Sequence, residues 1–254
     1  MRLDVMIATV MLSVRFGTAT ALTPIFGSIS LPTFVRVLLS LSFGAAVAAS
    51  LPPSSIQGLD QLSSPYLVVT ALHEAMTGAV FSLGFLSAYA ATQVAGRILD
   101  VQIGFGVAGI LNPATNAFSP LLGSLFGMAG VAVFLSMDGH HQLLRALALS
   151  AEIASPNIST HEVGALNILQ QSASMFVYGL MLAAPVMFAL LLVDITLAIY
   201  ARSLPQLNVL VLSFAIKVVV GMMLLAASLK WTQWTFLQLY KSTFAFWSQQ
   251  AVQL

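Results

Sequence analysis

Two His-Glu dipeptides carry the clearest potential for chemistry in this sequence. They are His73-Glu74 and His161-Glu162. A zinc-binding HExxH helix needs a second histidine four residues after the first, so that both imidazoles face one ion. Positions 77 and 165 hold Thr and Ala instead. Neither dipeptide therefore completes a metalloprotease motif.

A second histidine pair, His140-His141, directly follows Asp138-Gly139. Adjacent residues on a regular helix diverge by about 100°, so we expect a solvated or capping role for this pair rather than a shared metal ion. No Gly-x-Ser-x-Gly motif, phosphate-binding loop or dinucleotide fingerprint occurs, and the chain has no cysteine. The sequence predicts no catalytic residue, no metal site and no cofactor, and hence a protein that is not an enzyme.

Isolated ionisable residues in apolar sequence are the remaining candidates. Such residues are costly inside a membrane and mark either a transport pathway or a contact with a partner. Contact with a partner subunit is the favoured interpretation. Arg97 and Asp100 are three residues apart, hence on one helical face where they can pair. The predicted intersubunit polar contacts are Glu74, Arg97, Asp100, Asp194 and Lys217.

Composition places these residues in a membrane protein. Of 254 residues, 59% are hydrophobic and 7% are charged, whereas about a quarter are charged in a soluble domain. The net charge is only +1, and the Lys and Arg residues are scattered along the chain, which argues against nucleic-acid binding. The N-terminal run imitates a signal peptide, but Asp4 and Arg15 interrupt its pattern, so we expect the segment to be retained.

The stretch between Asp100 and Asp138 contains no charged residue. It is too long for one membrane helix of about 20 residues and too short for two crossings with a turn. Residues that break helices lie in its middle, namely Gly104, Gly106, Gly109, Asn112, Pro113 and Pro120. We expect a helix to resume at Leu121. An apolar loop of this kind is tolerated at membrane depth only against protein or a water-filled cavity, which favours a pore or a gate.

The whole chain is predicted to be all-α, a multi-helix membrane-embedded protein of helical hairpins with broken helices and a central uncharged loop. Apolar segments cover residues 5–31, 34–51, 66–95, 121–137, 163–193 and 200–229, with a kink expected at Pro185. Polar linkers cover 52–65 and 150–162. In residues 230–254, aromatic residues recur every three or four positions, which predicts an amphipathic tail at the membrane interface or, next, on a partner.

Taken together, the order and spacing of scattered positions resemble the family of the flagellar export-gate protein FliR and its virulence counterpart SctT. Single motifs are weak, and the order carries the resemblance from about Arg15 to Leu229. Arg97, Ser82 and Asn112 depart from the residues usual in that family. The matching positions are Arg15, Pro24, Ile25, Pro32 to Arg36, Glu74, Gly78, Gly84, Ala95, Gly96, Asp100, Gln102, Gly104, Pro113, Asp138 to His140, Leu144, Ser150 and Pro205 to Asn208.

The resemblance implies a core subunit of the type III protein export gate in the bacterial inner membrane, within the flagellar basal body or type III secretion apparatus. Implied partners are FliP- and FliQ-like subunits, FlhB- and FlhA-like proteins, membrane lipid and unfolded export substrates. It further implies a FliP-like part (1–160), a FliQ-like hairpin (161–229) and a plug loop (102–122). The plug residues would be Gln102, Ile103, Gly104, Phe105, Gly106, Gly109, Ile110, Leu111, Asn112, Pro113 and Phe118.

A neutral, flexible plug suits a channel for unfolded chains, because fixed charges would bind some segments and stall them. Its apolar side chains would exclude water and ions when it closes. Two alternatives stay open beside the flagellar interpretation. One is the virulence-type counterpart SctT. The other is a small-solute secondary transporter, whose broken helices also meet near the midplane. An intramembrane enzyme ranks third.

Overall fold

The computed structural model describes residues 3–23, 32–56, 58–59, 63–105, 120–153, 165–203 and 209–253. Within these ranges the chain forms helices joined by turns and contains no strand, which confirms the all-α prediction. Four of these helices are long and apolar enough to cross a membrane, or up to six spans if each bent helix pair counts as one. The described chain divides into two compact units, each made of separate segments.

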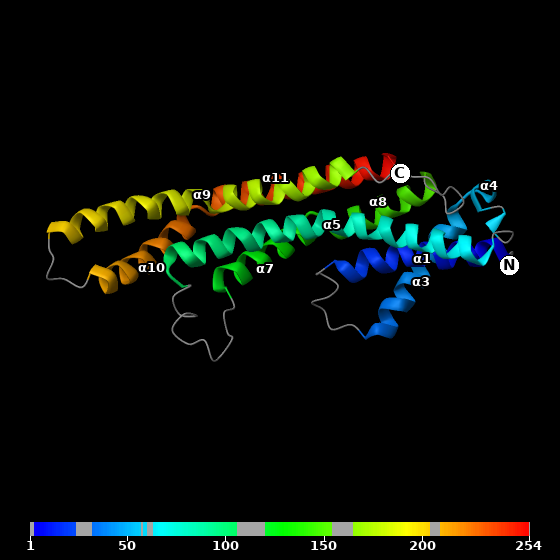
Figure 1. Ribbon diagram of the computed structural model, residues 1–254, viewed down its shortest axis with the longest axis horizontal. Helices are drawn as coiled ribbons and strands as arrows, with labels where there is room; N and C mark the ends of the chain where they lie inside the picture. The colour runs from blue at the N-terminus through cyan, green and yellow to red at the C-terminus, as the bar shows by residue number, and fades with distance from the viewer. Residues whose placement is uncertain are drawn as a thin grey trace. The chain divides into compact units, whose positions relative to one another are not determined.

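The first unit comprises residues 1–87, 135–172 and 241–254. It contains α1 (Leu3–Leu22), α3 (Thr33–Ser50), α4 (Pro53–Ile56), the first part of α5 (Ser64–Ile103) and α8 (Gly139–Ile153). Helices α1 and α3 pack together (Figure 1), with the rings of Phe16 and Phe43 stacked at 5.8 Å. The side chain of Ser13 lies directly against Gly44, where a larger residue would separate the two helices.

The second unit comprises residues 88–134 and 173–240. It contains the second part of α5, α7 (Leu121–Ser136), most of α9 (Ala165–Ser203), α10 (Val209–Ala227) and the first part of α11 (Leu229–Gln253). Gly96 of α5 lies against the backbone of Gly123 in α7, so closely that a Cβ atom on Gly96 would clash with it. This contact between two glycines lets α5 and α7 approach closely.

Two helices extend beyond the apolar segments of the sequence. Helix α5 continues past residue 95, through Arg97 and Asp100, and ends at Ile103, next to the predicted helix breaker Gly104. Helix α9 continues through Pro185 and ends at Ser203, whereas its apolar segment ends at residue 193. The predicted starts at residues 34 and 121 agree within one residue with α3 and α7. The division into FliP-like and FliQ-like parts stays a prediction.

The continuity of α9 has a visible cause at Pro185. Proline has no backbone N–H, so the carbonyl of Met181, four residues earlier, lacks its helical donor. The indole N–H of Trp231 donates a hydrogen bond to this carbonyl at 3.0 Å. An aromatic residue of α11 thereby satisfies the group that the proline leaves open.

The C-terminal tail is helical, but it does not present one aromatic face to its surroundings. In α11, Tyr240 and Trp247 are buried at 0% and 1% exposure, whereas Trp231 and Trp234 are about half exposed. The Trp247 indole N–H donates to the carbonyl of Phe81 at 2.8 Å. The buried half of the predicted aromatic stripe therefore packs inside the chain and is not available to a membrane interface.

Candidate functional site

The base of the predicted plug loop is fastened by the carboxylate of Asp100, which is 3% exposed. Its Oδ1 accepts the N–H of Leu122 at 3.0 Å, and its Oδ2 accepts the N–H of Gly123 at 3.1 Å. These N–H groups belong to the first turn of α7, where no helical acceptor exists and a negative charge is stabilised. Asp100 thus connects the end of α5 to the beginning of α7, across the loop.

The start of the loop, at the end of α5, is also held by specific contacts. Helix α5 ends at Ile103, and Gly104 follows it with a φ of +105°, which is accessible to glycine. The Gly104 N–H donates to the Asp100 carbonyl at 3.1 Å. A Cβ atom at Gly104 would also lie 3.0 Å from the ring of Phe214. Ile103 is fully buried against Gly221 of α10. Ile103 therefore belongs to the packed core of the second unit.

The remaining predicted plug residues divide into two groups. Gln102 and Phe105 are half-buried, and the Gln102 amide donates to Asp194 Oδ2 at 3.4 Å. Seven others lie outside the described residues: Gly106, Gly109, Ile110, Leu111, Asn112, Pro113 and Phe118. The plug role of all these residues stays a prediction, and the structure describes the two ends from which the loop starts and to which it returns.

A second polar site is enclosed in the first unit. Arg15 and Glu74 are 1% and 2% exposed and form a two-pronged ion pair, Nε to Oε2 at 2.5 Å and Nη2 to Oε1 at 2.9 Å. The third guanidinium nitrogen, Nη1, donates to Ser150 Oγ at 3.0 Å. The planar fork of arginine matches a carboxylate in this geometry. The site joins α1, α5 and α8.

Sequence reasoning missed Arg15 as the partner of Glu74. The sequence did contain a signal for this pair. Arg15 and Glu74 are isolated residues of opposite charge in apolar segments, and a buried charge needs a partner of opposite charge. An intersubunit contact for Glu74 stays a prediction, but its carboxylate is already occupied within the chain.

The second unit contains a more open ion pair between α9 and α10. Lys217 Nζ lies 2.5 Å from Asp194 Oδ1, and the side chains of Lys217 and Asp194 are 23% and 33% exposed. Asp194 also accepts the Gln102 amide, which brings this pair next to the end of α5. Arg97 is exposed and forms no ion pair with Asp100, since the Asp100 carboxylate turns to α7. The predicted Arg97–Asp100 pair is wrong.

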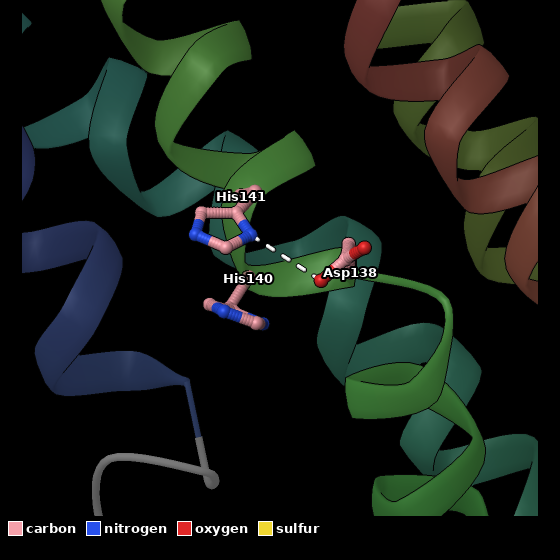
Figure 2. Close-up of side chains that lie close together, drawn as sticks. All are labelled: Asp138, His140 and His141. Atoms are coloured by element: carbon pink, nitrogen blue, oxygen red, sulfur yellow. Dashed lines mark hydrogen bonds and ion pairs between the residues drawn. The ribbon is translucent and has the colours of Figure 1, made fainter.

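Three side chains of types that can bind a metal ion lie close together where α8 begins. Figure 2 shows Asp138, His140 and His141 there, with His141 Nδ1 3.4 Å from Asp138 Oδ1. The rings of His140 and His141 lie 4.1 Å apart between centroids and are inclined by 37°. The expectation that the two rings diverge is therefore wrong. The break between α7 and α8 starts the helix with its histidines side by side.

In its described residues the chain is an all-helical membrane protein with a buried ion pair between Arg15 and Glu74 and a carboxylate that joins the end of α5 to the start of α7. Residues 6–243 match the model of the bacterial export proteins, family 1. The chain is 30% identical over 230 residues to the flagellar biosynthetic protein FliR of Bacillus subtilis, covering 88% of this chain and 86% of that protein. It is 28% identical to FliR of Escherichia coli over 205 residues, 80% of this chain and 77% of that protein.

Virulence-type proteins are similar as well. The Yop proteins translocation protein T of Yersinia pestis is 30% identical over 173 residues, which cover 64% of this chain and 66% of that protein. The family model covers far more than half of the chain. This chain belongs to the bacterial export proteins, family 1, and is a membrane-embedded component of a type III export apparatus.

Proposed function

We propose that this chain is the FliR-like core subunit of a flagellar type III export gate. In this role it forms, with FliP- and FliQ-like subunits, the channel through which unfolded export substrates cross the bacterial inner membrane. FlhB- and FlhA-like proteins are its further partners. Its contribution is a structural, non-catalytic one: it lines and closes a passage.

The flagellar assignment is supported by the extent of the similarity. Flagellar relatives match over 80% and 88% of this chain, whereas the Yersinia translocation protein matches over 64%. The virulence-type counterpart is the second candidate, and its support is the 30% identity to that translocation protein. Copurification with the flagellar or the virulence set of partner subunits from the native host distinguishes the two.

The observation that carries the gate role is the anchor formed by Asp100. A loop that only joins two helices needs no fixed ends, but here a buried carboxylate binds the first turn of α7. Gly96, one helical turn before Asp100 in α5, lies against Gly123 of α7 and lets the two helices make close contact. The end of α5 and the start of α7 are thereby tied together at the base of the proposed plug. A plug with a rigid base can swing aside and return to the same place.

The plug is tested by deleting residues 106–116, all of which lie between the anchored ends. The closed state needs to be favoured by only a few kcal/mol for the open state to stay rare. If the closed state is held by apolar contacts of the loop, losing several of them at about 1.5 to 3 kcal/mol each would reverse that preference. We expect an assembled but leaky complex, with raised ion conductance in lipid bilayers and slowed growth in salt.

A matched control replaces residues 106–116 by Gly and Ser at constant length. Because apolar contact rather than length holds the gate closed, this variant should leak as well. A deletion that is silent, or one that abolishes copurification with the partner subunits, would remove the plug hypothesis.

The anchor is tested separately with Asp100→Asn. The amide loses the charge and turns one donor toward a backbone N–H, which costs about 1 to 3 kcal/mol. We expect a complete complex with a conductance between those of the wild type and the deletion. Val101→Thr, at an exposed neighbouring position, is the control and should conduct like the wild type. Wild-type conductance in Asp100→Asn would contradict the role of the anchor.

A further inference from the structure

The turn before α8 shapes a group of side chains that the export role does not use. Asp138 has a φ of 55°, a left-handed conformation that Asp tolerates better than most residues. Its carbonyl accepts the N–H of Gln142 at 3.1 Å, which begins α8. The carboxylate of Asp138 then lies on the same side as the ring of His141, as the dashed line in Figure 2 marks.

The two histidine rings are close neighbours. Their centroids lie 4.1 Å apart and their planes are inclined by 37°, so the side chains do not point in opposite directions (Figure 2). The Nδ1 atom of His140 is shielded from solvent and has no hydrogen-bond partner within the described part of the chain. A shielded ring nitrogen without a partner is costly, and a bound ion would supply the missing interaction.

One carboxylate oxygen and two ring nitrogens all lie within 4.8 Å of one another. Zinc binds such atoms at about 2.0 to 2.2 Å in a tetrahedral arrangement, so its ligand atoms are about 3.3 to 3.6 Å apart. Small side-chain rotations close the difference, and they are free to occur because Asp138 and His141 are 73% and 70% exposed. The cluster is within reach of ligand geometry.

We propose that Asp138, His140 and His141 bind a divalent transition-metal ion of the zinc and nickel class. Imidazole suits these ions, whereas Mg²⁺ and Ca²⁺ require a shell of oxygens. Water completes the coordination on the exposed side. The ion ties the turn to the first turn of α8. All three ligands lie in the first unit, in one continuous segment.

Zinc titration of the full-length chain, purified with its partner subunits, tests the site. Competition with a chromogenic chelator measures the zinc affinity, and the absorbance of added Co²⁺ reports the ligands. We expect one ion per chain, with affinity reduced at least about 10-fold in His140→Gln, His141→Gln and Asp138→Asn, because loss of even a second-shell partner costs 10- to 100-fold. His73→Gln, on α5, is the control and should bind like the wild type.

Several results would overturn the proposal. Equal zinc uptake by the wild type and the His140→Gln/His141→Gln double variant would place the ion elsewhere. Unchanged affinity in Asp138→Asn would exclude the carboxylate as a ligand. If the variants do not assemble, the wild-type Co²⁺ spectrum decides: a spectrum identical to that of aqueous Co²⁺ rejects the site, and a more intense one with histidine ligation supports it.

Discussion

The two units differ in how deeply their ion pairs are buried. In the first, Arg15 and Glu74 are closed off from the surface, and both carboxylate oxygens are occupied by one guanidinium. In the second, Asp194 and Lys217 keep a quarter to a third of their side chains exposed among apolar helices. A buried pair is complete within the chain. A partly exposed pair leaves its charged groups accessible to the surroundings of the chain, and lipid tails cannot form hydrogen bonds with them.

An isolated charge in an apolar segment can therefore belong either to a pair buried within the chain or to a site that another subunit can reach. Glu74 and Asp194 look alike in the sequence, and both were predicted to contact another subunit. Burial separates them, since only Asp194 lies where another chain can reach it.

The largest effect is expected for Glu74→Gln. The substitution leaves the Arg15 guanidinium buried without a counter-charge, and breaking a buried pair in this way costs about 3 to 5 kcal/mol. Denaturant or thermal unfolding of the purified complex measures the loss. The control is the double variant Arg15→Met/Glu74→Met, which removes both charges and should be less destabilised than Glu74→Gln. Additive losses would show that the two charges do not act as a pair.

A charge exchange tests whether the second pair serves another subunit. Asp194→Lys/Lys217→Asp keeps an ion pair within the chain but reverses the charges that a partner meets. We expect the free energy of unfolding to stay within about 1 kcal/mol of the wild-type value, because partly exposed ion pairs contribute little. The amount of FliP- and FliQ-like subunits that copurify with the chain should fall. If the exchanged variant has the wild-type free energy of unfolding and the wild-type copurification, the pair acts only within the chain. The contrast with Glu74 would then not hold.

The smallest effect is expected for Trp231→Phe, which removes the donor to the Met181 carbonyl. A hydrogen bond of this kind contributes about 0.5 to 1.5 kcal/mol. Adding Pro185→Ala restores the backbone N–H that this carbonyl lacks, so Trp231→Phe should cost less in that background. A double-mutant cycle of unfolding free energies measures the difference. Equal costs in both backgrounds would mean that the indole does not compensate for the proline.

Much of the fold could be predicted because apolar segments and helix breakers are local features of the sequence. The start of α7 at Leu121 and the end of α5 near Gly104 follow from such signals. The contacts that fix the candidate sites are not local. Asp100 binds residues 22 and 23 positions away, and Arg15 binds Glu74 at a separation of 59. The helical periodicity of a sequence gives no information about contacts between residues so far apart in the chain.

The sequence predicted one segment running through Pro185, and α9 continues through it. The compensating donor could not be predicted, because Trp231 lies in another helix. The histidine rings were missed for a different reason: the rule for regular helices was applied to the first residues of α8, where Asp138 has a left-handed backbone.

The length of α5 limits how the chain can sit in a bilayer. At 40 residues it measures about 60 Å, twice the hydrocarbon thickness of about 30 Å. Even at a tilt of about 40°, the hydrocarbon accommodates only about 26 of its residues. About 14 residues of this helix must then stand beyond the lipid tails, and water or other protein has to surround them.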